Sequence, residues 1–197
     1  MAKSDPAAKS RERQKTIRWV VTIFLVTIVL SGTISLLSNL VMAGSSMTVA
    51  FLILLVIIFV GIVFDIVGMA VASADEKPFH SMASRKVPGA QEAIRLLRNA
   101  ERVSSICNDV VGDICGVVSG SAAATIAVQI LANFEFTWPQ VVSLVMSALA
   151  AGLTVGGKAV GKGFAFSSST QIVHGVGRLL YALHSFRRAS GSRNKKR

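Results

Sequence analysis

Charge is scarce in this sequence, and two long stretches contain no basic residue. Only 16% of the 197 residues are charged, against about 25% in a soluble domain, and 52% are hydrophobic. No Lys or Arg lies between residues 19 and 76 or between 103 and 157. The composition therefore argues against a soluble globular protein. The formal net charge of +11 has to be interpreted from the positions of the basic residues rather than from their sum.

Cysteine is also rare, which excludes a disulfide-rich fold. The chain has two cysteines, Cys107 and Cys115, within one apolar stretch. Eight residues apart on a helix, their side chains are too far apart to form a disulfide. We expect two free, packed thiols.

Four apolar runs fill the gaps between the basic residues. Each is at least as long as the roughly 20 residues that a helix needs to cross a bilayer. The runs are 17–41, 48–72, 106–132 and 139–166. A cleaved secretory signal is the weaker interpretation of the first run, which exceeds the roughly 7 to 15 apolar residues of such signals. The sequence predicts an all-α, polytopic membrane protein with four transmembrane helices and the lipid bilayer as its partner.

The basic residues indicate how these helices are oriented. The loops at 43–47 and 133–140 contain no Lys or Arg, whereas basic residues precede the first run, follow the second and follow the fourth. Because basic residues stay on the cytoplasmic side, both termini and the middle segment are predicted to be cytoplasmic, in an inner (cytoplasmic) cell membrane. Aromatic side chains near the ends of the runs are expected to be interfacial anchors. They are Trp19, Phe134, Phe136 and Trp138.

Two amphipathic helices are predicted on the cytoplasmic side. Segment 88–103 has apolar residues at helical spacing, with Pro88 suited to the first helical position, and forms a connector helix. Segment 171–188 has a second apolar stripe flanked by arginines and suits a juxtamembrane helix beside anionic lipid. Because the membrane explains the basic residues, we expect no nucleic-acid partner.

Catalysis has no positive signal, so we expect no enzyme. Gly152 to Lys158 matches the beginning of a phosphate-binding loop, but Ala159 stands where that motif needs Ser or Thr. The histidines show no metal-ligand spacing, and no nucleophilic set of Ser, His and Asp is recognisable. We expect no bound cofactor other than a transported cation.

The apolar runs carry ionisable residues that need an explanation, because a charge at membrane depth costs at least roughly 2.5 to 3.5 kcal/mol. They are Asp65, Asp109, Asp113 and Lys158, accompanied by Ser104 and Asn108. Helix periodicity places them at a similar depth, where they could form a cation site of oxygen ligands. Alternatively, Lys158 neutralises the aspartates as a structural ion pair. A shift of two residues would turn Asp113 towards this site and Asp109 away.

Small residues recur every four positions in the third and fourth runs. Gly112, Gly116, Gly120 and Ala124 form one ridge, and Ala148, Gly152 and Gly156 form another. Such ridges permit close contacts between membrane helices, and we expect a homodimer.

From residue 51 onward the order of elements resembles the transmembrane domain of the CorC and cyclin-M (CNNM) magnesium transporter family. Phe64 to Ala70 matches a Ser-x-x-Glu-Thr-Ala-like element, with Asp65 at the serine position. Cys107 to Asp113 is similar to a Gly-Asn-Asn/Asp-Leu-Val-Asn-like stretch, and Gly157 to Lys162 to a Gly-Glu-x-x-Pro-Lys signature. Lys158 stands where the family has an acidic residue, and Gly161 where it has proline.

The resemblance implies a cation site at Asp65, Ser104, Asn108 and Lys158 with Gly157, within a three-helix domain at 47–166. Together with the periodicity, the predicted metal ligands are Asp65, Ser104, Asn108, Asp109 and Gly157, with Lys158 as internal counter-ion.

The remaining segments complete the predicted domain organisation. They are a basic segment at 1–16, an extra helix and loop at 17–46, a juxtamembrane helix at 167–188 and a basic tail at 189–197, without CBS domains. The leading hypothesis is divalent-cation transport or homeostasis, with Mg²⁺ as a possible transported ion. The alternatives are a non-transporting scaffold or regulatory subunit, and proton coupling through the Asp/Lys cluster.

Overall fold

The computed structural model describes residues 6–134 and 138–193, and within them every regular element is a helix. This confirms the predicted all-α class. In chain order the elements are α1 (Pro6–Ala43), α2 (Met47–Ser73), α3 (Lys77–Ser84), α4 (Ala90–Arg98), α5 (Ala100–Ser105), the π-helical segment η1 (Ile106–Gly112), α6 (Asp113–Asn133), α7 (Pro139–Ser167) and α8 (Ser169–Arg193).

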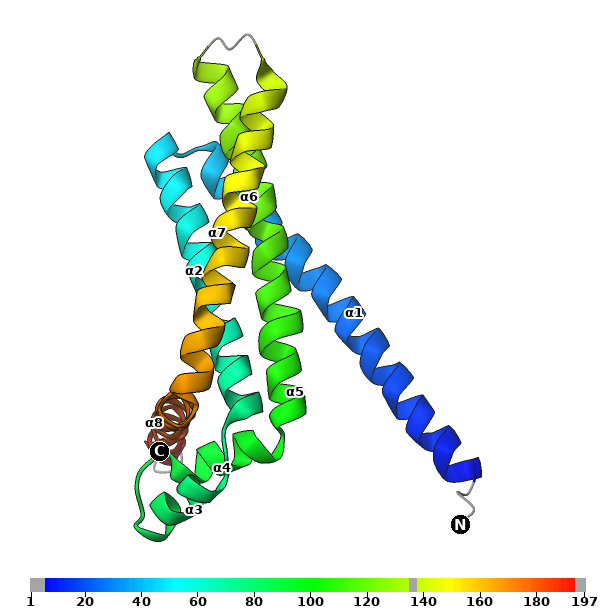
Figure 1. The fold of residues 1–197 in the computed structure, drawn as a ribbon, viewed down its shortest axis with the longest axis vertical. Helices are drawn as coiled ribbons and strands as arrows, with labels where there is room; N and C mark the ends of the chain where they lie inside the picture. The colour runs from blue at the N-terminus through cyan, green and yellow to red at the C-terminus, as the bar shows by residue number, and fades with distance from the viewer. Residues whose placement is uncertain (1–5, 135–137, 194–197) are drawn as a thin grey trace.

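Four helical stretches are long and apolar enough to cross a membrane, as predicted. They are Thr16–Met42, Met47–Ser73, Ala100–Asn133 and Pro139–Ser167. α2, α6 and α7 pack against one another as a bundle, whereas α1 contacts mainly α6 and diverges from the bundle towards its N-terminal end (Figure 1). No residue in the most apolar part of α1 is buried by protein. The chain is thus a candidate multi-pass membrane protein.

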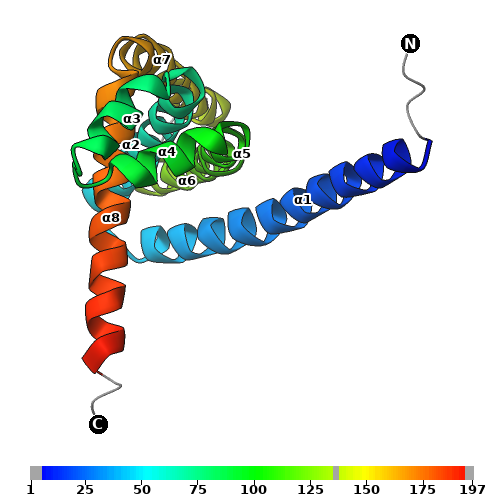
Figure 2. The same ribbon diagram turned by 90° about the horizontal axis from the view of Figure 1, so that it is seen from below.

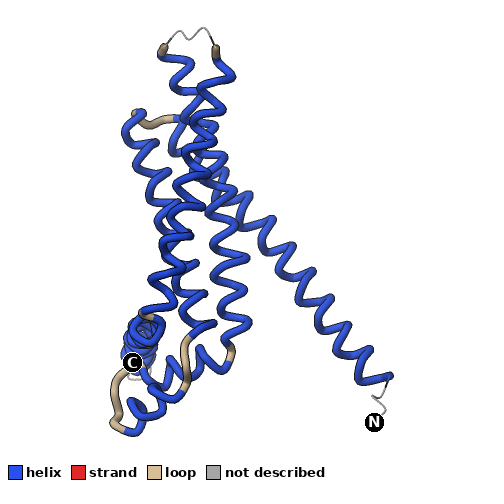
Figure 3. The backbone as a smooth tube through the Cα atoms, in the orientation of Figure 1, coloured by secondary structure: helices blue, strands red, loops and turns tan. Residues whose placement is uncertain are grey.

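The short connections between the long helices lie at one end of the bundle. α1 joins α2, and α6 leads towards α7, at the upper end in Figures 1 and 3, while α3, α4 and α8 gather at the lower end. α8 runs across the bundle axis rather than along it (Figure 2). The expected aromatic anchors Phe134 and Trp138 are exposed at the upper end, and Phe136 lies outside the described residues.

Two larger apolar cores are stacked along the bundle, and a smaller cluster is formed by Val110, Ile114 and Val118 of η1 and α6 with Ile23 and Ile57. The upper core is formed by α1, α2, α6 and α7 around Leu54, Ile126 and Met146. The lower core joins the C-terminal ends of α2 and α7 to α3, α4 and α8 around Val71 and Phe79. Because the apolar residues of α2 and α7 divide between these two cores, a short layer of the bundle between them is left for polar residues.

Glycines allow α2 to approach both of its neighbours. A Cβ atom on Gly61 would lie 2.8 Å from the Cβ atom of Cys115, so α6 passes directly over this glycine. On the other side, a Cβ atom on Gly161 would lie 2.7 Å from Cγ1 of Ile66. The predicted ridges are only partly used within the chain, since Gly116 and Gly120 have nothing within 4 Å of such an added atom.

The connector differs from the single helix predicted at 88–103. α3 was not predicted, Pro88 lies in the turn before α4, and α4 ends at Arg98. The side-chain amide nitrogen of the next residue, Asn99, donates to the carbonyl oxygen of Arg95 at 2.9 Å. α5 begins at Ala100 and continues through η1 into α6, so the third long helix starts six residues earlier than the predicted 106. The Asn99 amide offers the backbone an alternative partner, which explains the break.

A glycine contact fixes α8 against α4. Gly89 precedes α4 at φ 87°, a left-handed conformation that favours glycine, and the backbone nitrogen of Arg178 would lie 2.5 Å from an added Cβ atom. On α8, an added Cβ atom on Gly177 would lie 3.2 Å from the Cβ atom of Ala93. The predicted juxtamembrane helix is therefore held to the connector by backbone contact.

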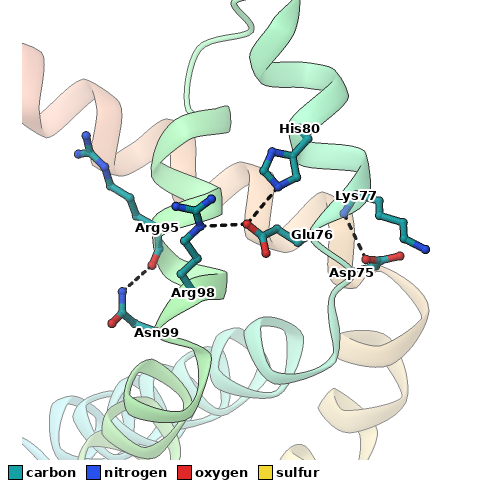
Figure 4. A network of polar contacts seen from close by, with 7 residues as sticks. All are labelled: Asp75, Glu76, Lys77, His80, Arg95, Arg98 and Asn99. Atoms are coloured by element: carbon teal, nitrogen blue, oxygen red, sulfur yellow. Dashed lines mark hydrogen bonds and ion pairs between the residues drawn. The ribbon is translucent and has the colours of Figure 1, made fainter.

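An exposed ion-pair network joins α3 to α4 (Figure 4). Glu76 Oε1 lies 3.1 Å from Nε2 of His80 and 3.2 Å from Nε of Arg98. These side chains are 38 to 66% exposed, and such surface pairs contribute little to stability. The network orients the connector more than it stabilises the fold.

A polar seam attaches α1 to α6 in the upper half of the bundle. Asn39 Nδ2 donates to Oγ of Ser121 at 3.0 Å, and Thr125 Oγ1 donates to Oδ1 of Asn39 at 3.1 Å. Ser35 Oγ also donates to Ser121 Oγ at 3.1 Å. Since α1 buries few of its apolar residues, these hydrogen bonds are its main specific attachment.

Asn39→Leu is expected to weaken this attachment by about 1 kcal/mol, because hydrogen bonds between membrane helices average roughly 0.6 kcal/mol and reach about 1.7. Unfolding in mixed detergent micelles would measure the loss. Thr33→Val is the control, since the Thr33 hydroxyl bonds only to Val29 O of its own helix at 2.7 Å. Equal stability of both variants would contradict a role for the seam.

Candidate functional site

Two aspartates and a lysine from three long helices meet in the layer between the two apolar cores. Lys158 Nζ on α7 lies 3.6 Å from Oδ1 of Asp65 on α2 and 3.8 Å from Oδ1 of Asp113 at the beginning of α6. We call these three residues the charged triad. The structure thus joins Lys158 to Asp65, as the ion-pair alternative predicts, and adds Asp113.

A glycine makes the approach of the three helices possible. A Cβ atom on Gly112 would lie 3.3 Å from Nζ of Lys158 and 3.6 Å from Oδ1 of Asp65. Any side chain larger than that of Ala would therefore occupy the space through which the lysine reaches Asp65. The glycine that was predicted to form a helix-packing ridge instead admits the ion pair.

The three members of the charged triad differ in how protein covers them. Asp65 is buried, at 6% exposed, and the Lys158 side chain is 20% exposed. The Asp113 side chain is 70% exposed, so the site is open on one side. With one ammonium group and two carboxylates, the site carries a formal charge of −1 when all three are ionised. A charge left open at membrane depth needs water or another protein surface against it.

A second pair of predicted ligands lies next to the triad. Asn108 Nδ2 donates to Oγ of Ser104 at 3.3 Å, as expected for residues four apart on a helix. The Oδ1 atom of Asn108 is buried without a hydrogen-bond partner and faces Gly68, one turn along α2 from Asp65. A buried carbonyl oxygen without a donor costs roughly 1 to 3 kcal/mol, so this atom is poised to accept a bond.

Asp109 does not reach the triad. Its Oδ2 atom accepts a hydrogen bond of 2.6 Å from Oγ of Ser105, and the residue is exposed. The reason is local, because residues 106–112 form a π-helical segment in which hydrogen bonds run from i to i+5. This wider turn shifts the register, so that Asp113 faces Lys158. π-helical turns are frequent at functional sites.

Gly157 and the cysteines have packing contacts in this region. An added Cβ atom on Gly157 would collide with the side chain of Ile62, so this glycine admits α2. Cys107 and Cys115 are free thiols, as expected, and each lies against a glycine of α2.

In the described part of the chain, residues 6–134 and 138–193, no group of three or more His, Cys, Asp and Glu residues is arranged to hold a metal ion. The side-chain oxygen atoms of the triad are those of its two carboxylates, and the backbone oxygen of Cys107 lies on the same side of Gly112, 3.4 Å from an added Cβ atom.

A cavity opens beside the helix that carries these polar residues. It has a volume of about 720 Å³ and lies between the N-terminal half of α1 and α5. Its lining includes Ser105, whose hydroxyl group donates to Asp109. Polar groups therefore continue from this cavity along the helix, with Asp113 four residues beyond Asp109.

Two polar features were not predicted as parts of a site. Asp113 was recognised as an ionisable residue, but α-helical periodicity led to Asp109 rather than Asp113 as the predicted ligand. The seam of Ser35 and Asn39 with Ser121 and Thr125 was missed, although polar residues four apart in two apolar runs were a readable signal.

Comparisons with known protein families, curated proteins and solved structures found no match to this chain.

Proposed function

We propose that this chain takes part in cation transport or homeostasis, with the charged triad as its intramembrane site. The observation that carries the proposal is the meeting of Asp65, Asp113 and Lys158 from three candidate membrane spans. Ionisable residues inside such spans are costly and commonly mark ion or proton pathways.

In this proposal Lys158 is a built-in cation that occupies the site when no other cation does. Its Nζ atom stands 3.6 and 3.8 Å from the two carboxylates, beyond the usual range of tight charge-assisted hydrogen bonds. An entering cation would displace the ammonium group and bind carboxylate oxygens, with Oδ1 of Asn108 as a further neutral acceptor. Because the ionised triad carries −1, a single positive charge balances it without complete removal of Lys158.

The relation to CorC and cyclin-M transporters belongs to the same proposal. It is supported by the motifs around Asp65, Asn108 and Lys158, and by the position of these residues on three successive long helices. Orientation with both termini in the cytoplasm is supported by the absence of Lys and Arg from both upper connections.

A second candidate function is a non-transporting scaffold or regulatory subunit. It is favoured by the position of Lys158 between both carboxylates, which balances most of the charge without any ion. In this alternative the triad is a structural ion pair that holds three helices together.

Ion flux into proteoliposomes would separate the two functions. We expect flux of a cation, tested with Mg²⁺, Na⁺ and H⁺ gradients in turn, and at least a tenfold loss in Asp65→Asn and in Asp113→Asn. Asp109→Asn is the matched control, because it removes a carboxylate four residues from Asp113 that does not contact Lys158. Flux that depends on pH and needs no metal ion would assign proton coupling.

The contrary results are equally specific. No flux of any of the three ions from an intact, folded preparation would reject transport and leave the scaffold. Equal flux in Asp113→Asn and Asp109→Asn would reject the triad as the transport site.

A further inference from the structure

The cavity between α1 and α5 is lined by two arginines, Arg18 and Arg102. Its lining residues are Thr16, Arg18, Trp19, Thr22, Glu101, Arg102 and Ser105. Among the described residues, none of the ion pairs involves Arg18 or Arg102. With Glu101 as the one acidic residue of this lining, the two guanidinium groups leave the cavity of about 720 Å³ with a formal charge of +1 and with donors for an anion.

One of these arginines is held in place by an aromatic ring. The guanidinium carbon of Arg102 lies 5.8 Å from the centroid of the Trp19 ring, within the range of a cation–π contact. This contact connects α5 to α1 across the cavity and leaves the N–H groups of Arg102 at its edge able to donate. Arginine matches phosphate oxygens through two parallel hydrogen bonds.

The position of the cavity identifies the source of the anion. α1 diverges from the bundle towards its N-terminal end (Figures 1 and 2). The residues that line the cavity come from two candidate membrane spans, Thr16–Met42 and Ala100–Asn133. Arg18 is the last basic residue of α1, and exposed apolar residues such as Val20 and Phe24 follow it. Charged groups at the end of an apolar surface fit a phospholipid better than a freely soluble anion.

We propose that this cavity binds the phosphate group of an anionic phospholipid, held by Arg18 and Arg102. The acyl chains of the lipid lie along the uncovered apolar surface of α1. The site is separate from the charged triad and does not depend on the proposed transport function. It gives α1, of which protein covers little, an attachment near its N-terminal end in addition to the seam at Asn39.

The chain contains two tryptophans, which allows a direct test. In a Trp138→Phe background, Trp19 is the single tryptophan and lines the cavity. The protein is reconstituted in phosphatidylcholine bilayers that contain either phosphatidylglycerol or phosphatidylcholine with brominated acyl chains. We expect the quenching of Trp19 by brominated phosphatidylglycerol to correspond to a local fraction of this lipid at least tenfold above its fraction in the bilayer. Quenching by brominated phosphatidylcholine corrects for changes in the surroundings of Trp19.

Arginine variants determine whether the cavity or the general positive charge is responsible. Arg18→Gln and Arg102→Gln should each reduce the enrichment about fivefold, the effect of one basic group near an anionic membrane surface. Arg85→Gln, which removes the same charge at an exposed position outside the cavity, should leave it unchanged.

Three outcomes would overturn the proposal. Equal quenching by the two brominated lipids would reject a phosphate site. Equal loss in Arg85→Gln and Arg102→Gln would assign the enrichment to overall charge. Relief of the quenching by inorganic phosphate at low concentration would show that the cavity takes free phosphate rather than a lipid headgroup.

Discussion

Lys158→Met is expected to lower the free energy of unfolding by about 3 to 5 kcal/mol, the usual cost of removing one partner of a buried ion pair. The substitution keeps an unbranched side chain of similar length but removes the ammonium group 3.6 Å from Asp65. Asp65, which is 6% exposed, would then be a buried carboxylate without a counter-ion and with Asp113 close by. Unfolding in mixed detergent micelles would measure the loss.

A matched control lies four residues along the same helix. Lys162 is exposed, so Lys162→Met should change stability by no more than about 0.5 kcal/mol. If Lys158→Met and Lys162→Met had the same free energy of unfolding, the triad would have no stabilising role. The scaffold alternative would then lose its basis.

A second substitution tests whether the lost charge balance is the cause. Asp65→Asn combined with Lys158→Met leaves no buried charge on α2 or α7, so most of the lost stability should return. Replacing both partners of a buried pair is often neutral or stabilising, in contrast to removing one of them. Failure of this rescue would indicate that Lys158→Met acts through packing rather than through the charge of Asp65.

The long helices and their hairpin arrangement could be predicted because they depend on properties of the sequence alone. A run of about 20 apolar residues without Lys or Arg has few stable conformations other than a spanning helix. The depth of the polar layer was also accessible, since Asp65 and Lys158 each lie about two turns from the end of their helix. The pairing of these two residues follows from that depth.

The choice between Asp109 and Asp113 was not accessible from periodicity. A prediction at 100° per residue assumes an α-helix throughout, whereas residues 106–112 form a π-helical segment. The segment carries no proline that would have signalled a break, and Gly112 has ordinary helical angles in the structure. Only the packing of α2 and α7 around Gly112 shows why the wider turn is favourable at this point.

The close helix contacts were only partly predicted, since Gly112 is the one glycine of the predicted ridges with a close contact to another helix. The four-residue ridge of Gly116 and Gly120 looked like a packing surface, but it has open space in the structure. The tight contacts involve Gly61 and Gly68, seven residues apart on α2 and therefore on one face. A ridge indicates that a helix can approach another closely, but it does not say whether the partner lies within the same chain.

Gly68→Ala is expected to destabilise the protein by about 1 to 3 kcal/mol, the usual cost of forcing an extra methyl group into a packed contact. The new Cβ atom would lie 2.9 Å from the Cβ atom of Cys107 and would collide with the amide group of Asn108. The Asn108 side chain can rotate, but the Cβ atom of Cys107 is fixed to the backbone of η1, so α2 and η1 would have to separate. Unfolding in mixed micelles would measure this loss.

Gly116→Ala is the control for this effect, because nothing lies within 4 Å of an added Cβ atom there and alanine favours a helix over glycine. We expect Gly116→Ala to be neutral or stabilising within a single chain. The separation caused by Gly68→Ala should also move Asp65 away from Gly112, because Asp65 lies on α2 and Gly112 lies on η1. If Gly68→Ala were as stable as Gly116→Ala, the close contact of α2 with η1 at Gly68 and Asn108 would not hold.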